Sequence, residues 1–495
     1  MAVKQSVFAA MALALCGALS ACGGGSSDGS GGTSQTGTTS QTGTTPTSPT
    51  TATVNMVVTD TPSTNITILS FQIQITGAVL QPGSVALLPR PVTVDLAQLV
   101  SDAGMLFSTV IDSATYTSLD MTFANPQVTL LNNTGATLML AGQSCAAGAT
   151  CTFVPNLNNA SVTISSGIFP MTVTASSSTG LSMDLSIPDL LQSDLSVSFA
   201  NGTSVNLSLL SGTSSTSQQA SIDDVVGSVT AVSGTQVNIK TAFGDSLVLT
   251  EGSSTSYAFP AAVCPANDAT CLSAGQIVSV DLGLLGDGSL SIHSMSYLGS
   301  SGSQWVKGLV LSSTATASTP TAQVLIQGEV NTSSVTPGEI ATVSLPAGTV
   351  FSVGTASYPM TSDMSFGGAT DLMPGQEVIL SVGSDLVAGA TPTFSASSAI
   401  LESSQVVGEV TAVDSGSVSL SMNGLSGLFT DARPLVQLMD VQTGTATTFS
   451  GFTSASLSAV TAGQFVVAKG PLFSGAGSGT PDLAAIQLTT RTSGN

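Results

Sequence analysis

Short runs of alternating apolar and polar residues, separated by Gly, Asn, Asp and Ser, fill most of this 495-residue chain. A period of two places successive side chains on opposite faces of a strand, whereas an amphipathic helix needs a period near 3.6. One or two helical turns are predicted only at 93–104. The clearest alternating runs are 54–60, 66–80, 128–140 and 194–210. The pattern therefore predicts an all-β protein, long enough for three or four domains.

Residues 53–215 are predicted to form one antiparallel β-sandwich. Several alternating runs of strand length follow one another there. The last two runs, within 194–210, are separated by Asn201-Gly202. Asn-Gly between two alternating runs is a strong signal for a two-residue hairpin turn, because both positions accept a positive φ. We therefore expect a hairpin at that point.

A repeated signature follows the predicted sandwich. The sequence VVGSVTAV at 225–232 returns as VVGEVTAV at 406–413 and more loosely as WVKGLVLS at 305–312. Later in each copy, a small residue or Pro is followed by Gly-Gln and a strand. Such self-similarity indicates a repeated structural unit. We predict three small β-modules, at 222–300, 304–401 and 404–490.

Glycines within both signatures have predicted conformational roles. Those of the first signature are expected to permit a bulge or tight coiling early in the first strand, and they are Gly227, Gly308 and Gly408. Those of the second are expected to form a turn before a later strand, and they are Gly275, Gly375 and Gly463. Asp287-Gly288 predicts a hairpin. We expect each module to be a small closed or nearly closed barrel, similar to an OB-fold.

The start of the chain predicts export. Lys4 precedes an apolar run that ends near Leu19, too short to span a membrane. The ending Leu19-Ser20-Ala21-Cys22 resembles the lipobox of bacterial lipoproteins. That resemblance implies a signal peptide at 1–21, cleavage between Ala21 and Cys22, and lipidation of Cys22. Residues 22–52 then form a Gly/Ser/Thr-rich tether that cannot bury a core.

The same resemblance implies an outer-membrane address. Gly23 follows the cysteine, in place of the Asp that retains many such lipoproteins at the inner membrane. Several acyl chains would anchor the chain stably, where one alone is marginal. The membrane, reached through the N-terminal lipid, is thus the first expected partner. An ordinary cleaved signal with a chance cysteine is the alternative.

The four remaining cysteines form two close pairs. Cys145 and Cys151 bracket a Gly/Ala loop, while Cys264 and Cys271 bracket a Pro/Asn/Asp loop. In an exported protein this spacing favours two disulfides across loop tips. A four-ligand zinc site would need more than two thiolates, and the only histidine, His293, is distant in sequence. We predict two disulfides, no metal and no cofactor.

The charge balance argues against nucleic acid as a partner. Seven Lys and Arg residues stand against 28 Asp and Glu, and only 7% of residues are charged. Binding to phosphate backbones requires Lys and Arg. We therefore expect no nucleic-acid ligand, and a protein or glycan ligand on the envelope in its place.

Two segments resemble families of exported domains. VVTDTPS at 57–63, PVTVDLAQL at 91–99 and IDSATYTSLDMTF at 111–123 resemble the family called domain of unknown function 4382. The chain departs from the family pattern at Thr61, Ala114 and Asp120. The repeats resemble domain of unknown function 5666, with Gln in place of the Asp that follows Gly. These resemblances imply envelope β-domains and supply no catalytic residues.

Candidate catalytic groups are few. His293 lies in an alternating strand and is interpreted as an outward-facing strand residue. Asp223-Asp224 are adjacent in a strand, so their side chains are expected on opposite faces, which does not favour an acid/base pair. Asp60, before Thr-Pro, is interpreted as an Asx-turn residue rather than a calcium ligand. Trp305, the only tryptophan, is expected to pack at a domain junction.

Three functions remain open. The favoured one is a non-enzymatic envelope lipoprotein whose β-modules serve as binding, adhesion or surface-scaffold units. The second is a periplasmic structural or assembly partner of an outer-membrane complex. The third is an envelope hydrolase, whose acid/base residues would have to come from distant parts of the sequence.

Overall fold

The computed structural model describes fourteen stretches of the chain. They are 51–61, 67–99, 103–132, 135–199, 205–210, 218–241, 246–314, 319–332, 334–354, 358–362, 364–389, 391–422, 437–475 and 480–491. Strands dominate them, and the helices within them have only three or four residues each. The predicted all-β class is therefore confirmed. The predicted signal peptide and Cys22 lie outside the described residues.

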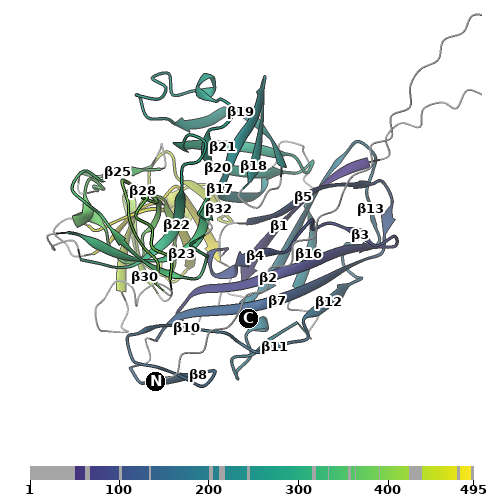
Figure 1. Ribbon diagram of the computed structural model, residues 1–495, viewed down its shortest axis with the longest axis horizontal. Helices are drawn as coiled ribbons and strands as arrows, with labels where there is room; N and C mark the ends of the chain where they lie inside the picture. Colours follow the sequence, from purple (N-terminus) through teal and green to yellow (C-terminus); the bar gives the residue numbers. More distant parts are fainter. Residues whose placement is uncertain are drawn as a thin grey trace, which may run out of the picture. The chain divides into compact units, whose positions relative to one another are not determined.

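The N-terminal region (residues 51–210) contains two larger sheets. One has the order β16-β14-β1-β5, with strands Thr51–Thr61 (β1), Gly104–Asp112 (β5), Ser178–Ser186 (β14) and Val205–Leu210 (β16). The other is built on two long strands that lie side by side (Figure 1), Thr67–Gln81 (β2) and Ser118–Leu131 (β7). Val85–Ala86 (β3), Val92–Asp95 (β4), Thr150–Phe153 (β10) and Ser161–Ile164 (β12) join that second sheet.

One apolar core unites side chains from both sheets. Met56 of β1 and Phe71 of β2 are both fully buried in it. Short strands pair around this core, and they are Thr115–Tyr116 (β6) with Met171–Thr172 (β13), Leu138–Leu140 (β8) with Gln143–Cys145 (β9), and Leu157–Asn158 (β11) with Val197–Ser198 (β15). The helical turn expected at 93–104 is present as Leu96–Gln98 (η1), and Ile187–Leu190 forms α1.

Three expectations for this region need correction. β1 begins at Thr51, so the predicted tether ends earlier than residue 52. β1 pairs in parallel with β14, so the region is not purely antiparallel. The runs on either side of Asn201-Gly202 do not form a hairpin with each other, because β15 pairs with β11 and β16 with β14. Asn201-Gly202 itself lies outside the described residues.

The first barrel (residues 218–299) is closed. Its strands are Gln218–Ser233 (β17), Gln236–Thr241 (β18), Ser246–Ala258 (β19), Ile277–Leu285 (β20) and Leu290–Gly299 (β21). Their order is β17-β18-β19-β21-β20, with β19 parallel to β21. Figure 1 shows these strands gathered together. The predicted hairpin at Asp287-Gly288 is confirmed between β20 and β21.

The second segment (residues 305–401) forms one seven-stranded sheet. Its strands are Trp305–Ser313 (β22), Thr321–Val330 (β23), Ile340–Ser344 (β24), Val350–Val353 (β25), Glu377–Ser381 (β26), Thr393–Ser395 (β27) and Ser398–Leu401 (β28). β24 pairs in parallel with β27, and β25 with β28. If β24 and β25 are counted as one interrupted strand, and β27 and β28 as another, the pairing order is that of the first barrel.

The third segment (residues 403–491) has the same kind of pairing. Its strands are Ser403–Asp414 (β29), Ser417–Met422 (β30), Gln437–Gln442 (β31), Thr448–Ser450 (β32), Phe465–Phe473 (β33), Asp482–Ala484 (β34) and Gln487–Arg491 (β35). The parallel pairs are β31 with β34 and β32 with β35. The first strand, β29, also pairs with β33, which is the fourth strand if β31 and β32 are counted as one.

The glycines of the first signature allow close approach of two backbones. A Cβ on Gly308 would lie 2.5 Å from the carbonyl oxygen of Leu325, and β22 has a register shift at this glycine. A Cβ built on Gly227 or on Gly408 would lie 2.8 Å from a backbone oxygen of the second strand, and each glycine lies two residues before a register shift in its strand. The predicted close coiling is confirmed.

The Gly-Gln signature closes a recurrent turn. Gly275, Gly375 and Gly463 have φ of +92°, +91° and +86°, which confirms the predicted turns. The Gln that follows accepts a hydrogen bond at its Oε1 from the backbone N–H three residues earlier in each copy. A 3-10 helix precedes each turn, at Ala269–Cys271 (η2), Ala369–Asp371 (η3) and Leu457–Ala459 (η5). The glutamine therefore has a structural role in each copy.

Candidate functional site: a buried ionic junction

Asp223 and Asp224 lie at a β-bulge in β17. Ile222 pairs with Leu282 and Val225 with Val280, so these two acidic residues face a single residue, Asp281, on β20. Asp224 has a φ of +53°, and its N–H donates to Asp281 Oδ1 at 3.0 Å. A bulge alters side-chain direction, and this one lets the adjacent carboxylates reach lysines of two different segments.

Lys307 of β22 is the first of these lysines. Its Nζ lies 2.5 Å from Asp224 Oδ2 and 3.1 Å from Glu377 Oε2. Glu377 begins β26, which pairs with β22. The Lys307 side chain is 22% exposed, and those of Asp224 and Glu377 are 10% and 11% exposed. Lys307 thus links the first barrel to the second segment.

Lys469 of β33 is the second lysine, and it forms an ion pair with Asp223. Lys469 is 3% exposed. The two pairs together connect the first barrel with both later segments. We call Asp223, Asp224, Lys307, Glu377, Glu402 and Lys469 the ionic junction.

Glu402 lies in the same charged surroundings. It is 6% exposed, and its N–H donates to the carbonyl oxygen of Glu377 at 2.9 Å. Burial raises the pKa of Glu402 well above its usual range, the charges of Asp224 and Asp281 raise it further, and Lys307 lowers it. A raised pKa favours the neutral, protonated form of a carboxyl group, which reduces the excess of negative charge around the lysines.

Lys307 remains charged in this setting. Burial by itself lowers the pKa of Lys307, but the charges of Asp224 and Glu377 raise it more, with a further contribution from the hydrogen bond to Asp224. The net result is a pKa well above the usual range. A charged lysine paired with ionised carboxylates in a poorly solvated site can fasten segments together, because an unpaired buried charge is very unfavourable.

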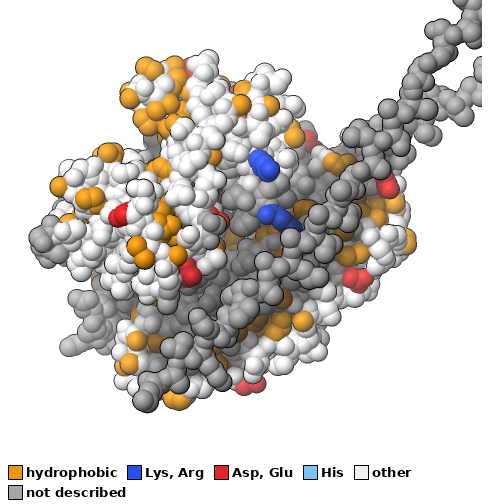
Figure 2. Space-filling view, viewed as in Figure 1, with side chains coloured by type: hydrophobic (Ala, Val, Ile, Leu, Met, Phe, Trp, Pro, Cys, Tyr) orange, Lys and Arg blue, Asp and Glu red, His pale blue; other side chains and the backbone are white. Residues whose placement is uncertain are grey.

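The ionic junction does not have the arrangement of a metal centre. Among the described residues, no group of three or more His, Cys, Asp and Glu side chains is placed to hold a metal ion. Charge is otherwise sparse on the face shown in Figure 2, where neutral polar and apolar side chains predominate. The ionic junction therefore brings together charged side chains, which make up only 7% of the sequence.

His293 is a half-buried residue of β21. It lies between Ile292, which pairs with Leu282, and Ser294, which pairs with Asp281, so it is the extra residue of a bulge. Burial lowers its pKa. Within the described stretches, its imidazole makes no hydrogen bond that would pair it with a nucleophile or a carboxylate. The strand position is as predicted, although the side chain is not fully outward.

Asp60 contacts a segment that is distant in sequence. It lies in β1 and is 6% exposed. Its Oδ1 accepts a hydrogen bond from the N–H of Ile187, 3.1 Å away at the start of α1. The carboxylate therefore joins strand β1 to a segment 127 residues away in sequence, and the residues of the predicted Asx-turn after Thr61 lie outside the described stretches.

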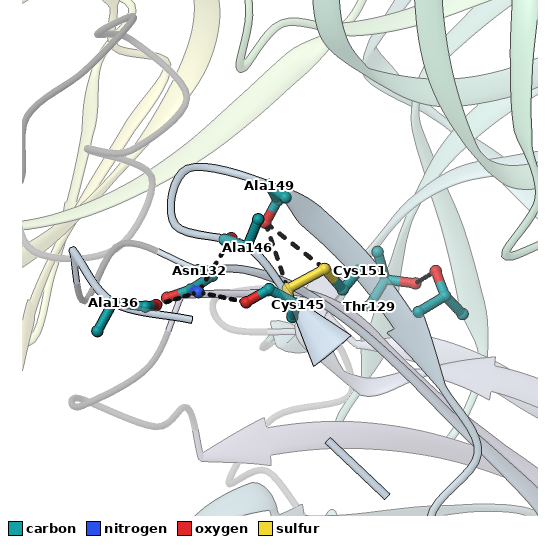
Figure 3. Close-up of a disulfide and its surroundings, with 8 residues drawn as sticks. Thr129, Asn132, Ala136, Cys145, Ala146, Ala149 and Cys151 are labelled. Carbon is teal, nitrogen blue, oxygen red and sulfur yellow. Dashed lines mark hydrogen bonds between the residues drawn. A yellow bond between two sulfur atoms is a disulfide. The ribbon is translucent and has the colours of Figure 1, made fainter. Parts of the chain in front are cut away.

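Both predicted disulfides are present. Cys145–Cys151 joins β9 to β10, with a Cα–Cα distance of 5.9 Å. Figure 3 shows the Asn132 amide beside this bond, donating to the carbonyl oxygens of Ala136, Cys145 and Ala146. Cys264–Cys271 has a Cα–Cα distance of 5.5 Å. Each disulfide fixes a short loop, and neither contributes to the ionic junction.

Trp305 packs between two segments, as predicted. It is 8% exposed and shares an apolar cluster with Ile277 and Leu298 of the first barrel and with Val330, Ile379 and Ile400 of the second segment. Ala21 and Cys22, the predicted cleavage and lipidation residues, lie outside the described stretches. None of the helices in those stretches is long and apolar enough to cross a bilayer.

Sequence reasoning missed the lysines and glutamates of the junction. A usable signal was the scarcity of cations, because Lys307 and Lys469 are two of only seven Lys and Arg residues and each lies within a predicted strand. Lysine inside an apolar strand of a charge-poor protein suggests a buried partner. That signal does not identify the partners, since Asp223 is 246 positions from Lys469.

Comparison with known proteins does not assign the chain to a family. The chain matches no protein-family model, and no curated protein shows a significant match to it.

Proposed function

We propose that this protein is an exported, lipid-anchored and non-enzymatic component of the bacterial cell envelope, whose β-modules form a fixed scaffold that presents binding or adhesion surfaces. The observation that carries the scaffold proposal is the ionic junction. It connects the first barrel to the second segment through Lys307 and to the third through Lys469. Modules fastened in this way keep their surfaces at fixed separations.

The disulfides support the export part of the proposal. Bonds such as Cys145–Cys151 and Cys264–Cys271 persist in oxidising compartments and are rare in the cytosol. They agree with the export signal predicted at 1–21. The outer membrane is the proposed address, with the membrane as partner through the lipid and with a protein or glycan as ligand.

The repeat also belongs to this proposal. The three segments share a pairing order and the hydrogen bond of the Gly-Gln turn. We propose that they are copies of one small barrel, with divergent interruptions in the second and third copies. The resemblances to domains of unknown function 4382 and 5666 point to the same class of exported β-domain.

Replacement of the proposed lipidation residue tests the anchor. Cys22→Ala is expected to abolish incorporation of labelled palmitate and to release the protein from the membrane fraction. Cys16→Ala is the matched control, because Cys16 would leave with the signal peptide, and this variant should label and fractionate like the wild type. Membrane retention of unlabelled Cys22→Ala protein would contradict the lipoprotein proposal.

Protease treatment of intact cells tests the presentation of the modules. An antibody against residues 437–475 reports whether the third segment is cut. Loss of the signal in intact cells would support surface presentation and direct the search to adhesion and glycan ligands. Protection until the outer membrane is permeabilised would contradict surface display and favour a structural role in the periplasm.

A further inference from the structure

A cavity of about 240 Å³ lies beside the ionic junction. Its walls come from β4, η1 and β5 of the N-terminal region, from β17, and from β22, β23 and β26 of the second segment. Apolar side chains form much of the wall, among them Val94, Met105, Ile222, Trp305, Val330 and Ile379. Mostly apolar cavities with a few convergent polar groups are the usual form of small-molecule sites.

Gln327 and Trp305 are the residues of this wall with buried side-chain polar atoms that lack a hydrogen-bond partner, at the Gln327 amide and at Trp305 Nε1. The side-chain nitrogen and oxygen of Gln327 are both buried, and neither has a hydrogen-bond partner in the structure. Burial of an amide without partners is unfavourable because the group loses its hydrogen bonds to water. Most buried polar groups in proteins are therefore paired. A bound molecule that makes hydrogen bonds to the Gln327 amide would therefore be favourable, because the chain itself supplies no partner.

A β-bulge places Gln327 at the cavity. Ile326 pairs with Gly308 and Gly328 pairs with Lys307, so Gln327 is the extra residue between them. The bulge depends on Gly308, where a Cβ would collide with the backbone of β23. Bulges of this kind occur beside binding sites, where they redirect a side chain.

The charged groups of the wall already have partners. Lys307 is bonded to Asp224 and Glu377. The carboxylate of Asp95 accepts hydrogen bonds from Ser70, Phe71 and Ala97, and that of Glu329 accepts two from Thr332. An anionic ligand would meet an excess of carboxylates, so a neutral ligand fits this wall better.

We propose that this cavity binds a small neutral molecule that carries an amide group on an apolar body. An amide offers one acceptor and one donor side by side, which complements the N–H and the oxygen of Gln327. The apolar body would lie against the hydrophobic wall. The volume exceeds that of a 150 Å³ cavity that holds benzene and suits roughly a dozen non-hydrogen atoms. The proposal is independent of the lipid anchor and of the envelope location.

Trp305 makes the test direct, because the only tryptophan of the chain lines the cavity. The probe is N-acetyl-L-leucinamide, which has two amides and one branched apolar side chain. Tryptophan fluorescence of the full chain is followed as the probe is added. A saturable change is expected, and ligand-observed NMR on the same samples verifies binding independently of the fluorescence. The absence of both signals at probe concentrations up to about 50 mM would overturn the proposal, with ordered water as the occupant.

The key variant is Gln327→Leu, and Gln323→Leu is its matched control. Gln323 is exposed on the same strand, four residues earlier, so this substitution repeats the chemical change away from the cavity. Gln327→Leu should raise the Kd of the probe at least tenfold, and Gln323→Leu should leave it unchanged. Because Gln327→Leu removes buried unpaired atoms, its unfolding midpoint should be equal to or above that of the wild type. Equal affinity in both variants would contradict the role of the amide.

A cavity-filling variant tests the location. A Cβ on Gly328 would have only the Lys307 side chain, 4.0 Å away, within reach, so Gly328→Leu should fill the cavity and abolish the fluorescence response. If circular dichroism shows that Gly328→Leu does not fold, Gly328→Val takes its place, with the same expected loss. An unchanged Kd in a folded filling variant would contradict binding at this cavity.

Discussion

The N-terminal region and the ionic junction bury charge in different ways. In the N-terminal region, the carboxylate of Asp95 is held by neutral donors, namely the hydroxyl of Ser70 and the N–H groups of Phe71 and Ala97. In the ionic junction, Asp224 and Glu377 are held by the ammonium group of Lys307. The first arrangement leaves the negative charge uncompensated, and the second neutralises it.

The difference has a consequence for pKa. Burial raises the pKa of Asp95 to about 6, although its three hydrogen bonds lower it. Lys307, in contrast, keeps its charge despite burial, because its partners are carboxylates. A chain with only seven Lys and Arg residues thus uses two of them where its segments meet, while neutral donors serve within the N-terminal region.

The largest effect is expected from Lys307→Met. This substitution keeps the length of the side chain but leaves the carboxylates of Asp224 and Glu377 without their cation. Removal of one partner from a buried ion pair typically lowers the free energy of unfolding by roughly 3–5 kcal/mol. Because Lys307 is partly exposed, we expect a loss at the lower end, about 3 kcal/mol. Urea unfolding followed by circular dichroism measures it.

Lys240→Met is the matched control for this experiment. Lys240 lies in β18 of the first barrel with an exposed side chain. Its replacement should change the free energy of unfolding by less than about 0.5 kcal/mol. Equal effects of the two lysine substitutions would show that the ionic junction does not fasten the segments, and the contrast between the two regions would then be lost.

The next effect concerns the covalent link in the N-terminal region. Cys145→Ala with Cys151→Ala should lower the free energy of unfolding by about 2–3 kcal/mol, because the unfolded chain regains the entropy of a closed loop of this length. Urea unfolding with and without a reducing agent measures it. The reductant should destabilise the wild type and, through Cys264–Cys271 alone, the variant to a lesser degree. An equal response of both proteins would show that the Cys145–Cys151 bond adds no stability.

The smallest effect is a change in pH dependence. Since the native pKa of Asp95 is about 6, above the ordinary 3.8, the native state binds more protons than the unfolded state between these values. The contribution of Asp95 to the free energy of unfolding is therefore lost as the pH rises through this range, by about 2 kcal/mol between pH 4.5 and 7. Asp95→Asn should remove that part of the pH dependence.

Urea unfolding of wild type and Asp95→Asn at both pH values tests this expectation. The raised pKa of Glu402 acts in the same direction and remains in both proteins, so only the difference between them is informative. Asp112→Asn, at an exposed position, is the control. If Asp95→Asn leaves the difference between the two pH values unchanged, neutral donors compensate the charge as fully as Lys307 does.

Local patterns predicted much of the fold. Alternation in the sequence predicted strands because neighbouring side chains on a strand point to opposite faces. Glycines at fixed places predicted turns because Gly275, Gly375 and Gly463 adopt a positive φ at little energetic cost. Short cysteine spacings predicted both disulfides. Each of these signals depends on residues that are close in sequence.

Predictions that needed knowledge of distant partners were wrong or missing. The predicted hairpin at Asn201-Gly202 was wrong, because β15 pairs with β11 and β16 pairs with β14. The two lysine partners of Asp223 and Asp224 were missed, because these residues lie at a bulge that the pairing of β17 with β20 sets. In both cases, the partner strand decided the outcome.

The sequence by itself determined the all-β class, the turn positions and the disulfides, because backbone conformational preference and short loop length are local properties. Only the tertiary structure decided which charges meet and where polar atoms lack partners. Lys307, Lys469 and Gln327 look alike in the sequence as single polar residues within apolar strands. Their environments differ because burial and pairing depend on residues that the fold brings together over hundreds of positions.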